Sequence, residues 1–239
     1  LHIDVLTFDE EEALKLKLEH CDEQDPQLIK SYLNDLKVFI SFWKKNPGEE
    51  RLFNSQKFLL GMNKDGEQSW YEPHQLFLDK PYLKTDLSKL PDTEMVPLSG
   101  EYKNKLPDNE VDDFVGFMKA VGVKFELNVI EAPIYFNQEY LSLLEDSSRV
   151  SQYERSKDYT IEGLEGYLEK PSIPISRLIW NALINAGESV AKACYRANAK
   201  SKYKIKPSQL VCHLRDTAWI PNESGAFHKP SDITSNDLL

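Results

Sequence analysis

Residues 66–76 read GEQSWYEPHQL, and residues 225–233 read GAFHKPSDI. Each stretch starts with a glycine and then contains an aromatic residue, a proline three positions later and an aliphatic residue after three more. The glycine closes a polar turn sequence, which is NKDG at 63–66 and NESG at 222–225. Because polar, glycine-containing turns between strand-forming residues are typical of hairpins, we predict two β-hairpins here.

The similarity between the two predicted hairpins leaves two interpretations open: an internal repeat, or two unrelated hairpins with common turn residues. In either case the aromatic residue would pack on the core, and the proline would end the returning strand because it cannot donate to a ladder. Both interpretations are structural and imply no chemistry. The residues that mark the pattern are Trp70, Pro73, Trp219, Pro221, Phe227 and Pro230.

Helical patterns surround the hairpins. A capping box at residues 7–10 predicts a first helix that runs to Cys21, and Asp25-Pro26 predicts the start of a second helix that ends at residues 46–48. Residues 190–205 fit either a strand or a helix. Further helices are expected at 108–121, 140–144, 161–168, 175–186 and 208–214, and a strand at 123–129.

These elements predict an α+β fold that is helix-rich, has two β-hairpin modules and lacks a parallel-sheet nucleotide fold. The expected division is a helical hairpin over 1–50, a first hairpin module with a following helix and strand over 51–130, and a helical region ending in the second hairpin module over 131–239. One continuous domain is the alternative.

Composition limits the classes of function. The 239 residues are 41% hydrophobic, which argues against disorder, and the longest apolar runs are too short for a membrane span. The net charge of −10 disfavours nonspecific binding of nucleic acid by the whole surface. An odd number of cysteines, three, predicts reduced thiols in the cytoplasm. Because the chain starts at Leu1, we expect it to be an internal part of a longer protein.

Motifs that carry chemistry are missing from the sequence. It contains neither G-x-x-x-x-G-K-[ST] nor G-x-G-x-x-G, and its adjacent His20-Cys21 and Cys212-His213 pairs do not have metal-ligand spacing. Cys194 lies in a basic neighbourhood that would lower its pKa if it were exposed, but its spacing also fits a buried face. We therefore predict no catalytic residues, no cofactor and no metal, with an unrecognised hydrolase site as a remaining alternative.

One stretch departs from the acidic average. Residues 192–206 contain six basic residues and no acidic one: Lys192, Arg196, Lys200, Lys202, Lys204 and Lys206. As a strand, the last four lysines would share one face, with Tyr203 and Ile205 on the other, and that basic face could bind phosphates. The alternatives are an edge strand protected by lysines or a patch matched to acidic helices. A helix at 208–214 followed by a hairpin also fits a winged helix. A recognition helix normally carries several basic or amide side chains toward DNA, and this one offers few: Gln209, His213 and Arg215.

Several stretches resemble large sacsin-like proteins. They are LRDTAWIP at 214–221, the pattern G-x-F-x-K-P-x-D at 225–232, WYEP at 70–73 with LFLD at 76–79, FMKAVGV at 117–123 and DYTIEGLE at 158–165. Together they cover the chain from about Ser55 to Ile233. Proteins of this family carry a GHKL-type ATPase domain, the fold of chaperone, gyrase and histidine-kinase ATPases.

The resemblance implies a middle or scaffold segment that lies after the ATPase domain and contains none of its motifs. Such a segment would relay conformational change to the remainder of the parent polypeptide or bind protein clients. The alternative is a nucleic-acid-binding segment that uses the basic stretch at 192–206. We expect a non-catalytic cytoplasmic segment with no membrane contact.

Overall fold

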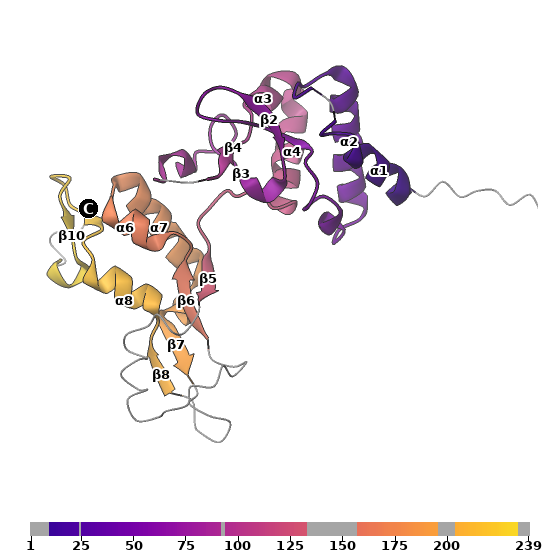
Figure 1. The fold of residues 1–239 in the computed structure, drawn as a ribbon. Coiled ribbons are helices and arrows are strands. Elements are labelled where there is room, and N and C mark those ends of the chain that lie inside the picture. Colours follow the sequence, from indigo (N-terminus) through magenta and orange to yellow (C-terminus); the bar gives the residue numbers. More distant parts are fainter. Residues whose placement is uncertain (1–9, 24, 92–93, 133–156, 196–203, 234–239) are drawn as a thin grey trace, which may run out of the picture. The chain divides into compact units, whose positions relative to one another are not determined.

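The computed structural model describes residues 10–23, 25–91, 94–132, 157–195 and 204–233. The chain folds as two compact units, one made of Leu1–Ser88 with Thr93–Phe125 and the other of Lys89–Asp92 with Glu126–Leu239 (Figure 1). The predicted fold class is confirmed, because helices coexist with two-stranded sheets and the described part of the chain contains no large parallel sheet. The expected boundary at residue 50 falls inside the first unit.

The first unit combines four α-helices with two small sheets. Its α-helices are α1 (Glu10–Glu19), α2 (Lys30–Lys45), α3 (Glu101–Lys105) and α4 (Asp108–Ala120). Its strands are β1 (Leu59–Met62), β2 (Gln68–Tyr71), β3 (Leu76–Phe77) and β4 (Val96–Pro97). Strands β1 and β2 pair antiparallel, and β3 and β4 pair parallel. Short 3-10 helices lie at η1 (Glu50–Leu52), η2 (Pro73–Gln75) and η3 (Leu87–Lys89).

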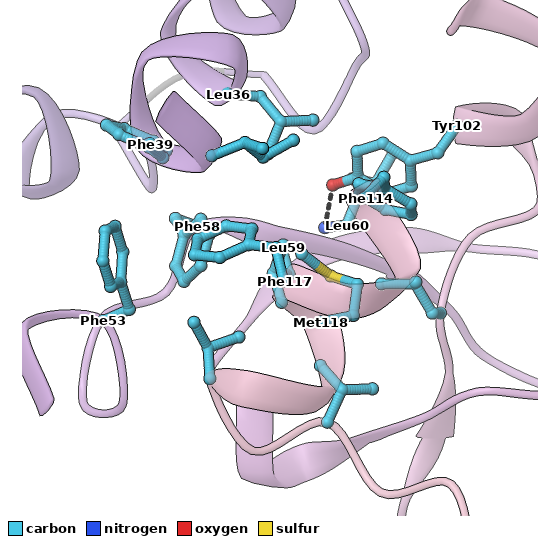
Figure 2. Packing of buried hydrophobic residues seen from close by; sticks show 14 of the residues in the cluster. Leu36, Phe39, Phe53, Phe58, Leu59, Leu60, Tyr102, Phe114, Phe117 and Met118 are labelled. Carbon is cyan, nitrogen blue, oxygen red and sulfur yellow. Dashed lines mark hydrogen bonds between the residues drawn. The ribbon is translucent and has the colours of Figure 1, made fainter. Parts of the chain in front are cut away.

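Aromatic side chains dominate the core of the first unit (Figure 2). Phe117 of α4 packs edge-on against Phe53, with ring centroids 5.0 Å apart, and Phe39 of α2 meets Phe58 in the same manner at 5.8 Å. Edge-to-face contacts of this kind add to the stabilisation that burial of the rings provides. The same core contains residues from α1, α2, β1 and α4, so both sides of the expected boundary at residue 50 belong to it.

A buried chain of hydrogen bonds fixes strand β1 within that core. The Leu60 amide donates to the Tyr102 hydroxyl at 2.8 Å, and the Tyr32 hydroxyl donates to the Phe58 carbonyl at 2.7 Å. The two hydroxyls lie 3.0 Å apart, so Tyr102 donates to Tyr32 and every group is satisfied. Burial, with a smaller contribution from the neighbouring phenol, raises the pKa of Tyr32 well above its usual range. Tyr32 therefore stays a donor.

The described part of the second unit contains a series of short strands and three α-helices. Strand β5 (Val129–Ala132) pairs antiparallel with β6 (Asp158–Ile161), and β7 (Lys192–Tyr195) pairs antiparallel with β8 (Lys204–Pro207). A bridge between Lys157 and Cys194 links the two pairs. The helices are α6 (Leu164–Glu169), α7 (Ile173–Ala186) and α8 (Gln209–Asp216), with 3-10 helices at η5 (Glu188–Ala191) and η6 (Pro230–Asp232).

The predicted end of α7 at Gly187 and the predicted cap of α8 at Ser208 are confirmed, while α7 begins two residues earlier and α8 ends two residues later than expected. The Ser172 hydroxyl accepts from the Ile175 amide at the start of α7, and Gly187 ends the helix with φ of 74°. The Ser208 hydroxyl caps α8 in the same way. The buried carboxylate of Asp158 also accepts from the Gln209 amide at 2.9 Å, which places a negative charge at the positive end of α8.

Both predicted hairpins are present, and their turns have the same geometry. The second consists of β9 (Ile220–Pro221) and β10 (Phe227–His228). Asn63 and Asn222 each accept from a glycine amide three residues on, and the side-chain oxygen of each accepts from the next amide, at 2.8 Å and 3.0 Å. Gly66 and Gly225 have φ of 80° and 82°, a region that favours glycine.

The prolines of the two hairpins also play the same part. Pro73 is the first residue of η2 and Pro230 is the first residue of η6, directly after each returning strand. A proline suits this position because it lacks the amide proton that a first helical residue cannot use. Whether the two hairpins descend from one repeated sequence stays a prediction.

The expected second helix and the strand expected at 123–129 differ from the structure. The second helix begins at Lys30 and not at Asp25-Pro26, because Leu28 is buried and Ile29 is extended with ψ of 160°. The strand expected at 123–129 is limited to Val129 onward, since the chain passes from one unit to the other at 125–126. The helix expected at 140–144 lies outside the described residues.

Candidate binding groove on the second unit

The basic stretch lies on the β7–β8 hairpin and is described only in part. Lys192 begins β7, and Lys204 and Lys206 belong to β8. The other three members, Arg196, Lys200 and Lys202, lie outside the described residues, as does Tyr203. The structure therefore brings three of the six predicted basic residues onto one hairpin.

The predicted apolar side of this strand is wrong at Ile205. In the antiparallel register, Lys206 lies opposite Ala193 and Ile205 lies opposite Cys194. Ala193 is fully buried while Ile205 is 66% exposed, so the face shared by Ala193 and Lys206 points inward. Lys206 is half-buried, which its long apolar stem permits. Whether the basic hairpin binds nucleic acid stays a prediction.

The described residues contain no metal-ligand cluster, and one of their cysteines is held in its thiol form. No group of three or more His, Cys, Asp or Glu side chains in the described ranges could hold a metal ion. Burial, reinforced by Asp35 and Asp22, raises the pKa of Cys21 to about 12, so this thiol is a poor nucleophile. Cys194 is only half-buried. Among the helices that the structure describes, none combines the length and the apolar character that crossing a membrane requires.

An apolar groove of 530 Å³ lies between α7, α8 and the second hairpin. Its walls are mostly aliphatic and aromatic side chains. The lining residues are Trp180, Leu183, Ile184, Gly187, Glu188, Val190, Ala191, Leu210, Val211, Leu214, Arg215, Trp219 and Pro230. The groove is therefore formed by residues of one unit alone.

Helix α7 supplies the exposed wall of the groove because two of its sides are apolar. One side is buried through Ile175, Leu178, Ile179 and Ala182. Ile173, Trp180 and Ile184 recur at intervals of seven and four residues and are 56%, 43% and 71% exposed. Residues at this spacing form a single stripe along a helix. Trp180 and Ile184 of this stripe line the groove.

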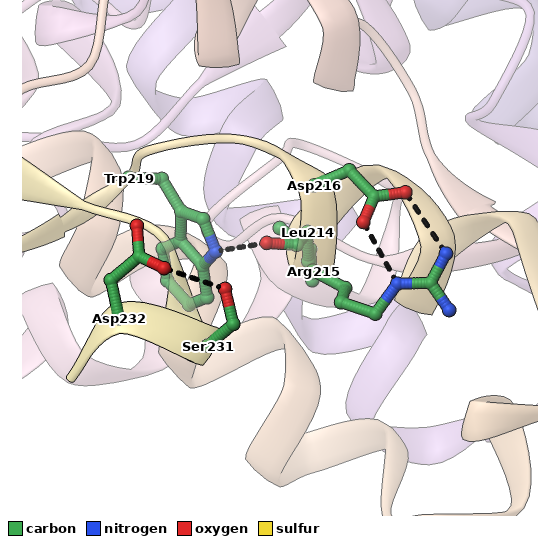
Figure 3. Close-up of polar contacts among 6 residues, drawn as sticks. All are labelled: Leu214, Arg215, Asp216, Trp219, Ser231 and Asp232. Carbon is green, nitrogen blue, oxygen red and sulfur yellow. Dashed lines mark hydrogen bonds and ion pairs between the residues drawn. The ribbon is translucent and has the colours of Figure 1, made fainter. Parts of the chain in front are cut away.

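Trp219 forms the floor of the groove and holds its walls together. Its indole nitrogen donates to the Leu214 carbonyl in the last turn of α8 at 2.9 Å (Figure 3). Its own carbonyl accepts from the Ser176 hydroxyl of α7 at 2.5 Å. Its ring lies 5.1 Å from that of Trp180. One buried residue thus fixes both helices and supports the exposed tryptophan.

Charge is sparse in the groove, where Glu188 and Arg215 are the charged members of its lining. The Arg215 guanidinium donates to both carboxylate oxygens of Asp216, at 2.8 and 2.9 Å (Figure 3). The bond from Arg215 lowers the pKa of the Asp216 carboxyl, so this pair is ionised at neutral pH. A bound molecule would therefore meet a mostly apolar lining with two charged side chains.

The groove was not expected from the sequence. The helix expected at 175–186 was predicted without assigning a role to Ile173, Trp180 or Ile184. The signal was present in the sequence, since the spacing of Ile173, Trp180 and Ile184 marks a second apolar stripe on the helix. Two of the six residues that mark the hairpin pattern, Trp219 and Pro230, line the groove. A third, Phe227, is half-buried.

No protein-family model, curated protein or solved structure matches the chain significantly. The resemblance to sacsin-like proteins therefore stays a prediction, and the case for a function depends on the groove.

Proposed function

We propose that this chain is a non-catalytic protein-interaction segment of a larger sacsin-like protein, and that it binds protein partners through the groove between α7 and α8. The observation that carries the proposal is the exposed stripe of α7 beside that groove. Apolar groups gain free energy when they leave water, at roughly 25 cal/mol for each Å² buried. Exposed apolar patches with polar margins mark interaction sites.

Trp180 gives the proposed site its centre. Tryptophan is enriched among the few residues that dominate binding energy at protein interfaces. Trp180 is supported from below by Trp219, which is only 2% exposed, so its position is fixed before a partner arrives. Binding would then cost little ordering of the site.

The composition of the groove favours a protein partner over a reaction. Among the described residues, its lining contains two charged side chains and no cysteine or histidine. General acid–base and nucleophilic chemistry need such groups within hydrogen-bonding distance of a substrate. The free thiols of Cys21, Cys194 and Cys212 fit the cytoplasmic location that we propose for the segment.

Site-directed photo-crosslinking tests this proposal. A photoreactive residue replaces Ile184 in the groove or, as a matched control, the exposed Lys64 in the turn of the first hairpin. We expect a discrete protein product from position 184 alone, which is identified and then purified for binding to the chain. Trp180→Ala should weaken that binding by roughly 30-fold, as for a residue at the centre of an interface. Identical products from both positions, or unchanged binding after Trp180→Ala, would contradict the proposal.

A further inference from the structure

The two units attach a long helix to a hairpin in the same way. In the first unit, the Tyr32 hydroxyl of α2 donates to the Phe58 carbonyl, directly before strand β1. In the second, the Ser176 hydroxyl of α7 donates to the Trp219 carbonyl, directly before strand β9. Aligned by these bonds and by the strand starts, Ser176 is the counterpart of Tyr32 and Trp219 is the counterpart of Phe58, and β9 and β10 are each two residues shorter than β1 and β2.

This correspondence matches the exposed stripe of α7 with the core of the first unit. Counting along each helix from the bonded hydroxyl, Trp180, Leu183 and Ile184 fall at the positions of Leu36, Phe39 and Ile40. The three residues of α2 are 0%, 0% and 9% exposed, whereas Trp180 and Ile184 are 43% and 71% exposed. Likewise, Leu214 precedes Trp219 by five residues, as Phe53 precedes Phe58.

Helix α4 covers this set of positions in the first unit. Its Phe117 ring lies 5.0 Å from Phe53, 6.2 Å from Phe58 and 5.7 Å from Trp43 of α2. The buried residues of α4 are Val111, Phe114, Phe117 and Met118. The groove of the second unit therefore corresponds to the space that an amphipathic helix fills in the first.

We propose that the groove receives an amphipathic helix of a partner protein, with large apolar residues at the spacing of Phe114, Phe117 and Met118. This inference rests on the proposed function and specifies its partner. No helix of the described ranges lines the groove besides α7, α8 and the short η5 and η6. Because two of its walls are the helices α7 and α8, a third helix could pack against them at the crossing angles that packed helices adopt.

The charge of the partner helix should differ from that of α4. In the first unit, Lys37 and Lys44 of α2 form ion pairs with Glu110 and Asp113 of α4. At the corresponding end of α7, the groove presents Glu188. An acidic residue at the position of Asp113 would meet a like charge there, while a basic one would meet an opposite charge. The partner helix should therefore be basic at that position, and α4 of a second copy should bind poorly.

Two synthetic helices test the proposal against the full chain. Both contain the sequence of residues 106–122, are held helical by a link on their polar face and carry a fluorescent label; one has Asp113→Lys. Anisotropy should show the Asp113→Lys helix binding at least about fivefold more tightly, since like charges across an interface are unfavourable. Ile184→Asp should weaken its binding by roughly tenfold or more, because it places a charge in an apolar contact.

A charge exchange supplies the decisive comparison. Glu188→Lys should reverse the preference, so that the unaltered helix binds more tightly than the Asp113→Lys helix. Equal affinity of both helices, or the same preference in wild type and Glu188→Lys, would overturn the inference, as would no binding at all. If crosslinks from position 184 persist while neither helix binds, the proposed function stands and only the helical partner is wrong. Loss of both would refute both.

Discussion

Replacing Tyr32 by Phe removes one hydroxyl from the core of the first unit and leaves its shape unchanged. The Phe58 carbonyl loses its 2.7 Å hydrogen bond, and the Tyr102 hydroxyl, 3.0 Å away, loses its acceptor. Tyr32 and Tyr102 are 1% and 0% exposed, so water cannot easily replace these bonds. A buried polar group without a partner costs about 1–3 kcal/mol, and at about 1–2 kcal/mol for each of these two neutral groups the expected loss is roughly 2–4 kcal/mol.

Urea unfolding followed by hydrogen exchange and mass spectrometry measures this loss in each unit separately. With a urea dependence of about 2 kcal/mol per molar, the midpoint of the first unit should fall by about 1–2 M. The exchange of α7 and α8 should be unchanged at low urea. Tyr71→Phe, at a half-buried tyrosine of β2, is the matched control and should shift the midpoint little. A loss below about 0.5 kcal/mol in Tyr32→Phe would refute the role that we assign to the network.

Three further predictions concern the acid stability from Asp79, two glycines and nucleic acid. Burial of Asp79 alone would raise its pKa, but hydrogen bonds from the Ser88 hydroxyl and from nearby amides outweigh it and lower the pKa. Asp79 should therefore contribute stability above about pH 4 that is lost as pH falls through its lower folded-state pKa, and Asp79→Asn should flatten this acid limb in urea titrations. Gly61→Ala should cost roughly 1–3 kcal/mol, because the new methyl would lie 2.7 Å from Leu76, whereas Gly116→Ala in α4 should be neutral or stabilising in thermal unfolding. Finally, fluorescence anisotropy with labelled DNA and RNA across a salt series should show no binding, because the chain is acidic and part of the basic strand faces inward. Binding that is lost when the lysines at 200, 202, 204 and 206 are replaced by Glu would favour the nucleic-acid alternative.

Features with a local cause could be predicted from the sequence. The Asn63 and Asn222 turns need only a side-chain oxygen that accepts from nearby amides and a glycine that adopts a positive φ. The start of α8 needs only a serine cap, and the end of α7 only Gly187. In each case the determinants lie within about five residues, so the tertiary structure had little to change.

Features with a distant cause were missed. The start of α2 depends on Leu28, which is drawn into a core that α4 and β1 complete, and this overrides the local signal of Asp25-Pro26. Which side of β8 points inward depends on its partner strand β7. Ala193 of β7 is buried, and Lys206 of β8 lies opposite it on the same side. Alternation along one strand gives the two faces but not which of them is buried.

The groove was missed for a related reason. Periodicity identifies the apolar residues of α7, but only the neighbouring elements decide which of them are covered. In the first unit the chain itself supplies the cover through α4, and the equivalent residues of α2 are buried. In the second unit the same kind of hairpin positions the helix, yet Trp180 and Ile184 stay exposed.

This difference links binding to stability. A partner that covers α7 would bury apolar surface in the second unit as α4 does in the first, and a ligand that binds only the folded form adds RT ln(1 + [L]/Kd) to the free energy of unfolding. Because Trp219 holds α7, α8 and the second hairpin together, that added stability would reach all three elements and not the contact residues alone. Binding of a partner would then reduce the conformational freedom of the whole second unit. A change of this kind is what a segment needs if it is to transmit a binding event to the rest of a larger protein.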